Sequence, residues 1–393
     1  MSVSPSHPER WIAQHVTGLP RSGIRDFFEL VQGVPDVISL GVGEPDFTAP
    51  WRAREAAIYA LERGRTSYTS NLGLLKLRRA IANFLAKHFQ LGYDPEKEIL
   101  VTVGVSEALD LALRALLDPG DEVIIHQPCF VSYAPSIKLA HAKVVEVVTS
   151  PESGFQLDLN ALEKAITPKT KAVLINFPCN PTGSTLSSDT ARKLAEVIIR
   201  NDLLLITDEI YACLVYDQPF VSPASFPGMH ERTIYLNGMS KAWAMTGFRL
   251  GFVCAPQPLL EAMMRVHQYC MMCASIISQE AAVAALSYCD DDIEQMRQSF
   301  HKRRNYLHAR FLELGLKCEL PQGAFYMFPD IRELGLQSKD FALQLLESQK
   351  VAAVPGSAFG SAGEGFLRCC YATSIDELRE ACDRIGRFLE TLR

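Results

Sequence analysis

One segment of this sequence combines residue types that could do covalent chemistry. It runs from Ser240 to Arg249 (SKAWAMTGFR) and holds a lysine, Lys241, among apolar residues. A free ammonium group is costly to bury, whereas a lysine that forms a Schiff base with a carbonyl compound becomes part of an imine. Arg249 offers a planar guanidinium fork that matches a phosphate group. Taken alone, the segment also fits a surface lysine and a salt-bridged arginine.

A second segment, Asp208-Glu209-Ile210-Tyr211, directly follows the apolar run LLLIT. A carboxylate at the end of a buried strand can pair with a protonated heterocycle, and that pairing makes the ring an electron acceptor. Tyr211 could donate a hydrogen bond to a phenolate oxygen of the same ring. Two acids after a strand are also typical of magnesium sites, but the phosphate-binding sequence GxxxxGK[ST] is absent from the chain.

Two predicted turns add further polar groups. Asn180 begins an NPTG turn, and its side chain could donate to the same phenolate oxygen. The residues Gly104, Val105 and Ser106 join a predicted strand to the start of a predicted helix. Free N–H groups and the helix dipole favour an anion there by about 0.3–1 kcal/mol. An ordinary helix N-cap would explain Ser106 equally well.

These segments lie within an alternating pattern of short apolar strands and helices. Such a pattern predicts βαβ units and a largely parallel sheet. Ligands of such sheets bind beyond the carboxyl ends of the strands, which is where the four segments stand. The predicted strands are Ile99–Val103, Val123–His126, Lys143–Val148, Ala172–Phe177, Leu203–Thr207, Thr233–Leu236 and Leu250–Cys254.

The remainder of the chain predicts a second, smaller α/β unit. A chain of 393 residues is longer than one hydrophobic core usually supports. We therefore expect a large domain over residues 48–290 and a small domain that joins residues 1–47 to residues 291–393. After the large sheet, the sequence predicts helices in Pro258–Cys289, a long helix Asp292–Leu314, strands in Gly323–Phe328, Val351–Val354 and Phe366–Ala372, and a last helix Ile375–Leu392.

Composition excludes several classes of partner. The net charge of -6 argues against a nucleic-acid surface, which needs a basic patch. No apolar run is long enough for a membrane span, and the first residues lack the apolar core of a signal peptide. Cys270 and Cys273 form one isolated CxxC pair among 11 cysteines, which indicates free thiols rather than a zinc site. We expect a cytoplasmic protein that binds no metal, nucleic acid or membrane.

In order and spacing, these segments resemble those of the class I/II aminotransferases, a family of fold-type I pyridoxal-phosphate enzymes. Within that family they resemble the aspartate and aromatic aminotransferases. The lysine of that family lies in the pattern SKxxxxxGxRxG, its acid in DExY and its turn in NPTG, as they do here. The resemblance extends from GVGEPDF, which begins at Gly41, to RCCYAT, which begins at Arg368. It implies the PLP-transferase fold type I, with a mostly parallel seven-stranded sheet, pyridoxal 5′-phosphate as cofactor, and a homodimer.

The resemblance also implies a role for each matched residue. Lys241 would anchor the cofactor as a Schiff base and move protons, and Asp208 would hold the ring nitrogen. Tyr211 and Asn180 would bind the phenolate oxygen, and Phe130 would stack on the ring. The phosphate group would be bound by Arg249, Ser240, Gly104, Val105 and Ser106, and by Tyr68 of the neighbouring subunit. The substrate carboxylate would be bound by Arg368, with the backbone of Gly43 and with Asn180.

Three positions depart from the family pattern. Gly238 replaces a hydroxyl residue that helps to bind the phosphate in some members, Cys369 and Cys370 replace small or apolar residues, and Phe130 replaces a larger aromatic residue. None of these changes removes Lys241 or Asp208.

The predicted reaction is ping-pong transfer of an amino group from an L-amino acid to a 2-oxo acid such as 2-oxoglutarate. Aromatic donors are favoured and aspartate comes next, because Phe27, Phe28 and Tyr326 could form an apolar wall, although ordinary core packing explains them more simply. The alternatives are a C–S β-lyase on the same fold and, more remotely, a nucleotide-binding dehydrogenase. No GxGxxG motif follows the first predicted strand, which argues against the dehydrogenase.

Overall fold

The large sheet of the protein has seven strands, and six of them run parallel to one another. The structure is a computed structural model that describes residues 8–392, without the side chains of Asp26, Phe27, Phe28 and Leu30. All seven predicted strands belong to this sheet, which confirms the predicted fold class. In spatial order they are β2 (Ile99–Thr102), β8 (Gly251–Cys254), β7 (Thr233–Gly238), β6 (Leu204–Asp208), β5 (Thr170–Asn176), β3 (Glu122–Gln127) and β4 (Lys143–Val148).

One strand, β8, runs antiparallel to both of its neighbours. Gly238 at the end of β7 pairs with Gly251 at the start of β8, and Gly251 also pairs with Thr102 at the end of β2. The start of β8 therefore lies at the same edge of the sheet as the carboxyl ends of the other strands. Asn176 and Asp208, the last residues of β5 and β6, are paired at this edge too.

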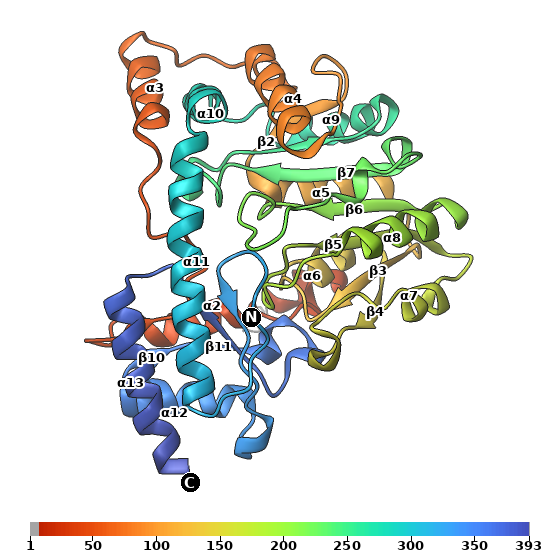
Figure 1. Cartoon of the computed structure of the whole chain (residues 1–393). Coiled ribbons are helices and arrows are strands. Elements are labelled where there is room, and N and C mark those ends of the chain that lie inside the picture. Colours follow the sequence, from red (N-terminus) through yellow and green to blue (C-terminus); the bar gives the residue numbers. More distant parts are fainter. Residues whose placement is uncertain (1–7, 393) are drawn as a thin grey trace, which may run out of the picture.

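Helices cover both faces of the large sheet (Figure 1). Successive strand residues point to opposite faces, so Leu174 packs in the cluster that contains α5 and α6, whereas Val173 packs in the cluster that contains α7 and α8. Strands such as β2 and β5 are apolar on both faces because both faces are buried, whereas the edge strand β4 is largely exposed or only half-buried. The helices that precede or cover this sheet are α3 (Trp51–Glu62), α4 (Leu75–Phe89), α5 (Gly104–Leu116), α6 (Tyr133–Leu139), α7 (Leu159–Ala165), α8 (Ser188–Arg200), α9 (Gln257–Cys270) and α10 (Ile276–Tyr288).

The two ends of the chain meet in a second cluster of small sheets. Ile38 of β1 pairs with Val351 of β10 in parallel, which places the N-terminal segment beside the C-terminal part of the chain. A three-stranded antiparallel sheet lies next to it. The strands are β1 (Ile38–Ser39), β9 (Tyr326–Met327), β10 (Val351–Ala352), β11 (Val354–Pro355) and β12 (Leu367–Cys370), and the helices are α1 (Gln14–Thr17), α2 (Gly23–Val31), α11 (Asp290–Glu313), α12 (Ser338–Gln349) and α13 (Ile375–Leu392).

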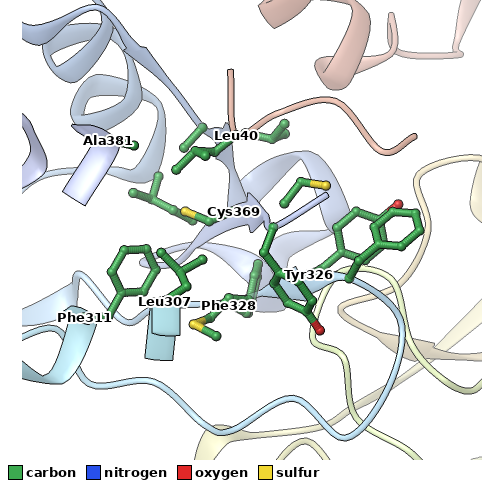
Figure 2. Close-up of a cluster of buried hydrophobic side chains, with 14 of the residues drawn as sticks. Leu40, Leu307, Phe311, Tyr326, Phe328, Cys369 and Ala381 are labelled. Carbon is green, nitrogen blue, oxygen red and sulfur yellow. The ribbon is translucent and has the colours of Figure 1, made fainter. Parts of the chain in front are cut away.

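A single hydrophobic cluster holds this second part together (Figure 2). Its side chains come from the N-terminal segment (Leu40), from α11 (Leu307 and Phe311), from β12 (Cys369) and from α13 (Ala381). The same cluster includes the ring of Tyr211, which belongs to the loop after β6. Residues of the large sheet's edge are thus packed directly against the second part of the chain.

Several element ends are shifted by one or two residues from the sequence prediction, and three of the differences matter for helix capping or strand pairing. Helix α5 begins at Gly104, so Ser106 lies in its first turn and the interpretation of Ser106 as an N-cap is wrong. The predicted strand Gly323–Phe328 is reduced to β9, and Val351–Val354 is divided between β10 and β11. The division follows from pairing, because β10 joins β1 whereas β11 joins β12.

Candidate active site

A cavity of about 470 Å³ opens at the carboxyl edge of the large sheet and gathers most of the predicted site residues. Gly104 lies beside it, and Tyr68 lies outside it. The predicted residues that line it are Gly43, Val105, Ser106, Phe130, Asn180, Asp208, Tyr211, Ser240, Lys241, Arg249, Tyr326 and Arg368.

Lys241 lies in the connection between β7 and β8, with its amine facing the cavity. Its Nζ donates a hydrogen bond to the carbonyl oxygen of Gly43 at 2.6 Å. The amine also lies 5.9 Å from the ring centre of Tyr211 and 5.8 Å from that of Phe325. Burial lowers the pKa of Lys241 to about 8. A lysine with this lowered pKa has a larger fraction of neutral, nucleophilic amine near neutral pH than an ordinary lysine has.

Asp208 ends β6 and presents a buried carboxylate to the cavity. Its Oδ2 accepts a hydrogen bond from the hydroxyl of Tyr133 at 2.8 Å, and its Oδ1 accepts one from the backbone N–H of Ile210 at 3.2 Å. Burial raises the pKa of Asp208 to about 6, while these two hydrogen bonds and the charge of Lys241 act in the opposite direction. A cation in the cavity beside this carboxylate would lower its pKa further.

Arg368 lies on β12 and brings the second part of the chain into the site. Its side chain is buried, with one Nη donating to Asn180 Oδ1 at 3.0 Å and the other to the carbonyl oxygen of Gly41 at 2.6 Å. The guanidinium lies 4.5 Å from the ring centre of Tyr326 and 4.9 Å from that of Phe359. Its buried Nε donates no hydrogen bond within the described part of the chain. The group is therefore rigidly held and still has N–H groups to offer to a carboxylate.

Two tyrosines meet in the cavity. The hydroxyl groups of Tyr211 and Tyr326 lie 2.8 Å apart in a hydrogen bond. Tyr326 is both part of the hydrophobic cluster and a lining residue of the cavity, so its ring packs as core while its hydroxyl is polar lining. Gly43 is required here, because a Cβ at this position would lie 2.6 Å from the Tyr326 hydroxyl oxygen. Phe27 and Phe28, the other two residues of the predicted apolar wall, have side chains outside the described set.

The predicted phosphate-binding groups come together at the start of α5. Gly104 has a φ of +76°, and a Cβ there would lie 2.8 Å from Nη2 of Arg249. The glycine thus leaves room for the guanidinium against the first turn of the helix. Arg249 itself has a φ of +48° and is exposed, and its Nη1 donates to the carbonyl oxygen of Thr246 at 3.2 Å. Val105, Ser106 and Ser240 line the cavity as well.

Tyr68 stands apart from the other predicted residues. It lies in the loop between α3 and α4, and its side chain is 81% exposed. It does not line the cavity of its own chain among the described residues. Its predicted role therefore depends on a second subunit.

Sequence reasoning missed Tyr133, whose hydroxyl is the closest side-chain partner of the Asp208 carboxylate. The residue is fully buried and packs edge-on against Phe130, with ring centres 5.7 Å apart. The only signal in the sequence is its position three residues after Phe130, which is too weak to assign a role. Ile210 and Thr246 also line the cavity and stand inside the two strongest motifs.

Two absences hold for the described residues. Within residues 8–392 no cluster of three histidine, cysteine, aspartate or glutamate side chains is arranged to bind a metal ion. No helix in the same range combines the length and the apolar character that crossing a membrane would require.

Comparison with known proteins decides the family. The sequence profile of the family described as aminotransferase class I and II matches residues 35–385, which is most of the chain. This protein is a class I/II aminotransferase. It therefore uses pyridoxal 5′-phosphate and acts on an amino acid and a 2-oxo acid. This assignment replaces the remote alternative of a nucleotide-binding dehydrogenase.

Relatives of both substrate types cover nearly the whole chain. The aspartate aminotransferase of Pyrococcus abyssi is 47% identical over 94% of this chain and 95% of its own. The aromatic-amino-acid aminotransferase 2 of Thermococcus litoralis is 44% identical over 94% of this chain and 96% of its own. The structure of an aromatic aminotransferase from Pyrococcus horikoshii superposes with a TM-score of 0.89, at 45% identity over 94% of this chain and 99% of that one.

The cavity fits the cofactor of this aminotransferase family. Asp208 is a buried carboxylate with a raised pKa, Lys241 is a buried amine with a lowered pKa, and Arg249 lies with its guanidinium against Gly104 at the start of α5. These three features match, in turn, a protonated ring nitrogen, an aldehyde carbon and a phosphate group.

Proposed function

We propose that this aminotransferase takes its amino group from an aromatic L-amino acid, with aspartate as the next best donor, and passes it to a 2-oxo acid such as 2-oxoglutarate by a ping-pong mechanism. The preference for an aromatic donor rests on the charged residues that line the cavity. Among the described lining residues the cations are Lys241, Arg249 and Arg368. Each has a proposed role elsewhere, so no cation among the described lining residues remains for a second carboxylate. A dicarboxylate such as aspartate or 2-oxoglutarate would need a cation from the neighbouring subunit of the proposed dimer.

Apolar lining supports the same preference. Ile24 and the ring of Tyr326 border the cavity and offer contact to an aromatic side chain. Burying an aromatic ring against such a wall contributes on the order of 1.5–3 kcal/mol. The relatives named for aspartate and for aromatic amino acids are about equally similar to this chain, so the preference rests on the lining residues.

The proposed roles at the cofactor follow from the positions of the side chains. When bound, pyridoxal phosphate supplies a conjugated ring that accepts electrons from the bond broken at the amino acid. Lys241 would hold the cofactor and, once released, take the proton from the substrate Cα through its Nζ. Asp208 would hold the proton on the ring nitrogen, and Tyr211 and Asn180 would donate to the ring oxygen.

The remaining residues would bind and orient. Arg249, Ser240 and the first turn of α5, from Gly104 to Ser106, would hold the phosphate group. Phe130 and Ile210, which both line the cavity, would flank the ring. Arg368 would bind the substrate carboxylate, and its contacts with Asn180 and Gly41 fix it before the substrate arrives.

We also propose a homodimer in which Tyr68 reaches the phosphate group of the neighbouring subunit. Large apolar side chains are exposed on α3, shortly before Tyr68 in the sequence, and at or just beyond the C-terminal ends of α9 and α10: Trp51, Ile58, Tyr59, Leu61, Tyr269, Met271, Met272 and Tyr288. Helices α3 and α10 pack against each other. Apolar side chains that gather in this way mark a surface for another subunit.

The two-domain division is a further proposal. The large domain would comprise residues 48–290, and the small domain residues 1–47 and 291–393. The pairing of β1 with β10 supports the union of the two chain ends. A cytoplasmic location stays a prediction from the sequence.

The role of Lys241 is tested by reduction with borohydride followed by peptide mapping. The pyridoxyl label should appear on Lys241, and Lys241→Ala should lose both the label and the transamination activity. A label on another lysine, or normal turnover in the variant, would contradict the scheme. Arg368→Lys should raise the KM for the amino acid more than it lowers kcat, because an ammonium cannot reproduce the planar fork.

The substrate proposal is tested by steady-state rates for a panel of amino donors with 2-oxoglutarate. Phenylalanine, tyrosine and tryptophan should give the highest kcat/KM, followed by aspartate. A reversed order would overturn the preference without affecting the family. Cystathionine serves as the control for C–S β-lyase activity, since a lyase would release pyruvate in the absence of any oxo acid.

A further inference from the structure

A buried histidine lies behind the turn at which α5 begins, outside the cavity. His267, on α9, is fully buried, and its Nδ1 lies 2.6 Å from Oε1 of Glu107. Glu107 stands in the first turn of α5, with 9% of its side chain exposed. A carboxylate oxygen only accepts hydrogen bonds, so the histidine donates through Nδ1–H. The pair therefore joins α9 to the beginning of α5 in a site shielded from water.

The other oxygen of Glu107 holds the backbone of the turn. Oε2 accepts a hydrogen bond from the N–H of Val103, the residue before the helix. Val103 is the N-cap residue and has no side chain that could cap the helix. The hydroxyl of Thr102 donates to the carbonyl oxygen of Gly104 at 3.0 Å on the same turn. Glu107 thus satisfies the N–H of the N-cap residue, as the acid of a capping box does.

This same turn is the proposed binding site for the cofactor's phosphate group. Val105 and Ser106 line the cavity, and Gly104 lies against the guanidinium of Arg249. The first N–H groups of a helix have no carbonyl partner inside the helix, so they are available to an anion only if the turn keeps its shape. Whatever fixes the turn therefore also fixes the donors of the phosphate site.

We propose that His267 and Glu107 are positioning residues for the phosphate group of the cofactor. His267 fixes the carboxylate of Glu107, and Glu107 fixes the turn from Val103 to Ser106. Without the histidine, one oxygen of a buried carboxylate loses its donor, and the side chain gains by turning towards water and releasing the Val103 N–H. The inference rests on the proposed assignment of this turn to the phosphate.

A purely structural role would have a different signature. A pair that only joins α9 to α5 would, when broken, weaken the binding of every ligand of the cavity to a similar extent. A pair that shapes the phosphate site would weaken only ligands that carry a phosphate. Pyridoxal and pyridoxal phosphate differ in that group alone, so their affinities for the apoenzyme separate the two roles.

The experiment measures the dissociation constants of both compounds for the apoenzyme of the wild type, His267→Leu and His267→Asn. In His267→Leu we expect the Kd of pyridoxal phosphate to rise about tenfold, with the Kd of pyridoxal changed less than about twofold. In His267→Asn, the amide N–H can take the place of Nδ1–H, so the Kd of pyridoxal phosphate should return to within about threefold of the wild type. Melting of each apoprotein checks that the variants fold.

Two further variants keep the result decisive. Glu107→Asp retains the charge but is too short to reach both Val103 and His267, so it should also weaken the binding of pyridoxal phosphate selectively. It replaces His267→Leu if that variant does not fold.

Arg249→Leu is the control for the phosphate site itself. If Arg249→Leu is selective while the His267 and Glu107 variants show no change or weaken both compounds equally, the positioning role is wrong. If Arg249→Leu is not selective either, the assignment of the phosphate site is wrong and the proposal fails with it.

Discussion

The end of β6 carries two adjacent acids that face opposite sides of the large sheet and have different environments. Asp208 points into the cavity, where Tyr133 and the backbone of Ile210 donate to it and Lys241 adds a positive charge. Glu209 is fully buried on the other side and accepts hydrogen bonds from Ser222 at 2.7 Å and Thr207 at 3.0 Å. Its Oε2 has no partner among the described residues.

The difference bears on which of the two acids fits the proposed role at the ring nitrogen of the cofactor. Burial raises the pKa of Glu209 to about 8, which is above the value of about 6 that burial gives Asp208. Near neutral pH Glu209 is therefore mainly protonated and neutral, whereas Asp208 is mainly ionised. A neutral carboxyl group cannot hold a cation, so a strand-end acid is functional only where donors and an open cavity keep its charge.

The largest effect should come from exchanging each acid for its amide. Asp208→Asn should lower kcat by about three orders of magnitude, or roughly 4 kcal/mol, because a neutral amide cannot hold a protonated ring nitrogen. Glu209→Gln should change kcat less than about threefold, because the native group is already neutral. Steady-state kinetics with a saturating amino donor measures both. Equal losses of kcat in the two variants would contradict the proposed difference in function between Asp208 and Glu209.

The next effect concerns stability against pH. The pKa of Glu209 is raised from 4.5 to about 8 in the folded protein, so the folded state binds more protons than the unfolded state between these values. Its contribution to stability is present in full below the unfolded pKa and is lost as pH rises towards 8. Relative to wild type, Glu209→Gln should gain up to about 4 kcal/mol in free energy of unfolding between about pH 5 and pH 8.

Urea unfolding of the two apoproteins across this pH range measures that difference. A constant difference between variant and wild type would mean that Glu209 is ionised in the folded protein, and the contrast with Asp208 would then be wrong.

A smaller effect should follow from removing the hydroxyl beside Asp208. Tyr133 donates to the carboxylate and lowers its pKa, so Tyr133→Phe should raise that pKa. Loss of one hydrogen bond to a charged group corresponds to about one pKa unit. The acidic limb of kcat/KM should move to higher pH by that amount, while the ring packing against Phe130 is kept. An unchanged pH profile would mean that Tyr133 only fills space.

The smallest effect belongs to the matched change on the opposite face. Ser222→Ala also removes one hydroxyl donor from a buried acid, here Glu209. It should lower the free energy of unfolding by about 1 kcal/mol and leave the pH profile of kcat/KM unchanged. Urea unfolding and the same pH series used for Tyr133→Phe measure the two quantities. A shift of the profile would show that Glu209 does influence the cavity.

The sequence predicted the seven strands of the large sheet and most of the cavity because both depend on local signals. Continuous apolar runs mark strands buried on two faces, and Lys241, Asp208 and Asn180 stand in short motifs at strand ends. The contacts between distant segments were not predictable. Tyr133 reaches Asp208 across 75 positions, and His267 reaches Glu107 across 160. Such pairs depend on how helices pack and leave no periodic pattern.

Other differences between prediction and structure arise at residues whose local sequence fits two interpretations. Ser106 fitted an N-cap because serine is common at that position, whereas Val103 is the N-cap residue and Glu107 accepts the hydrogen bond from its N–H. Tyr326 was expected to be an apolar wall or ordinary core, and its hydroxyl in fact bonds to Tyr211. The roles of the individual site residues, the exchange of Tyr68 between subunits and the preferred donor stay predictions that the experiments above address.

The reversed direction of β8 has a consequence for engineering. Because the chain returns at the same edge of the sheet, Lys241 and Arg249 share one connection between β7 and β8 without a helical crossover. The proposed anchor of the cofactor and its proposed phosphate ligand therefore lie in one continuous segment, which can be transplanted as one cassette. An insertion between them would separate the two groups, whereas insertions in loops at the opposite edge would leave the cassette intact. A scan of short peptide insertions along the large sheet should accordingly find its least tolerant positions between Lys241 and Arg249.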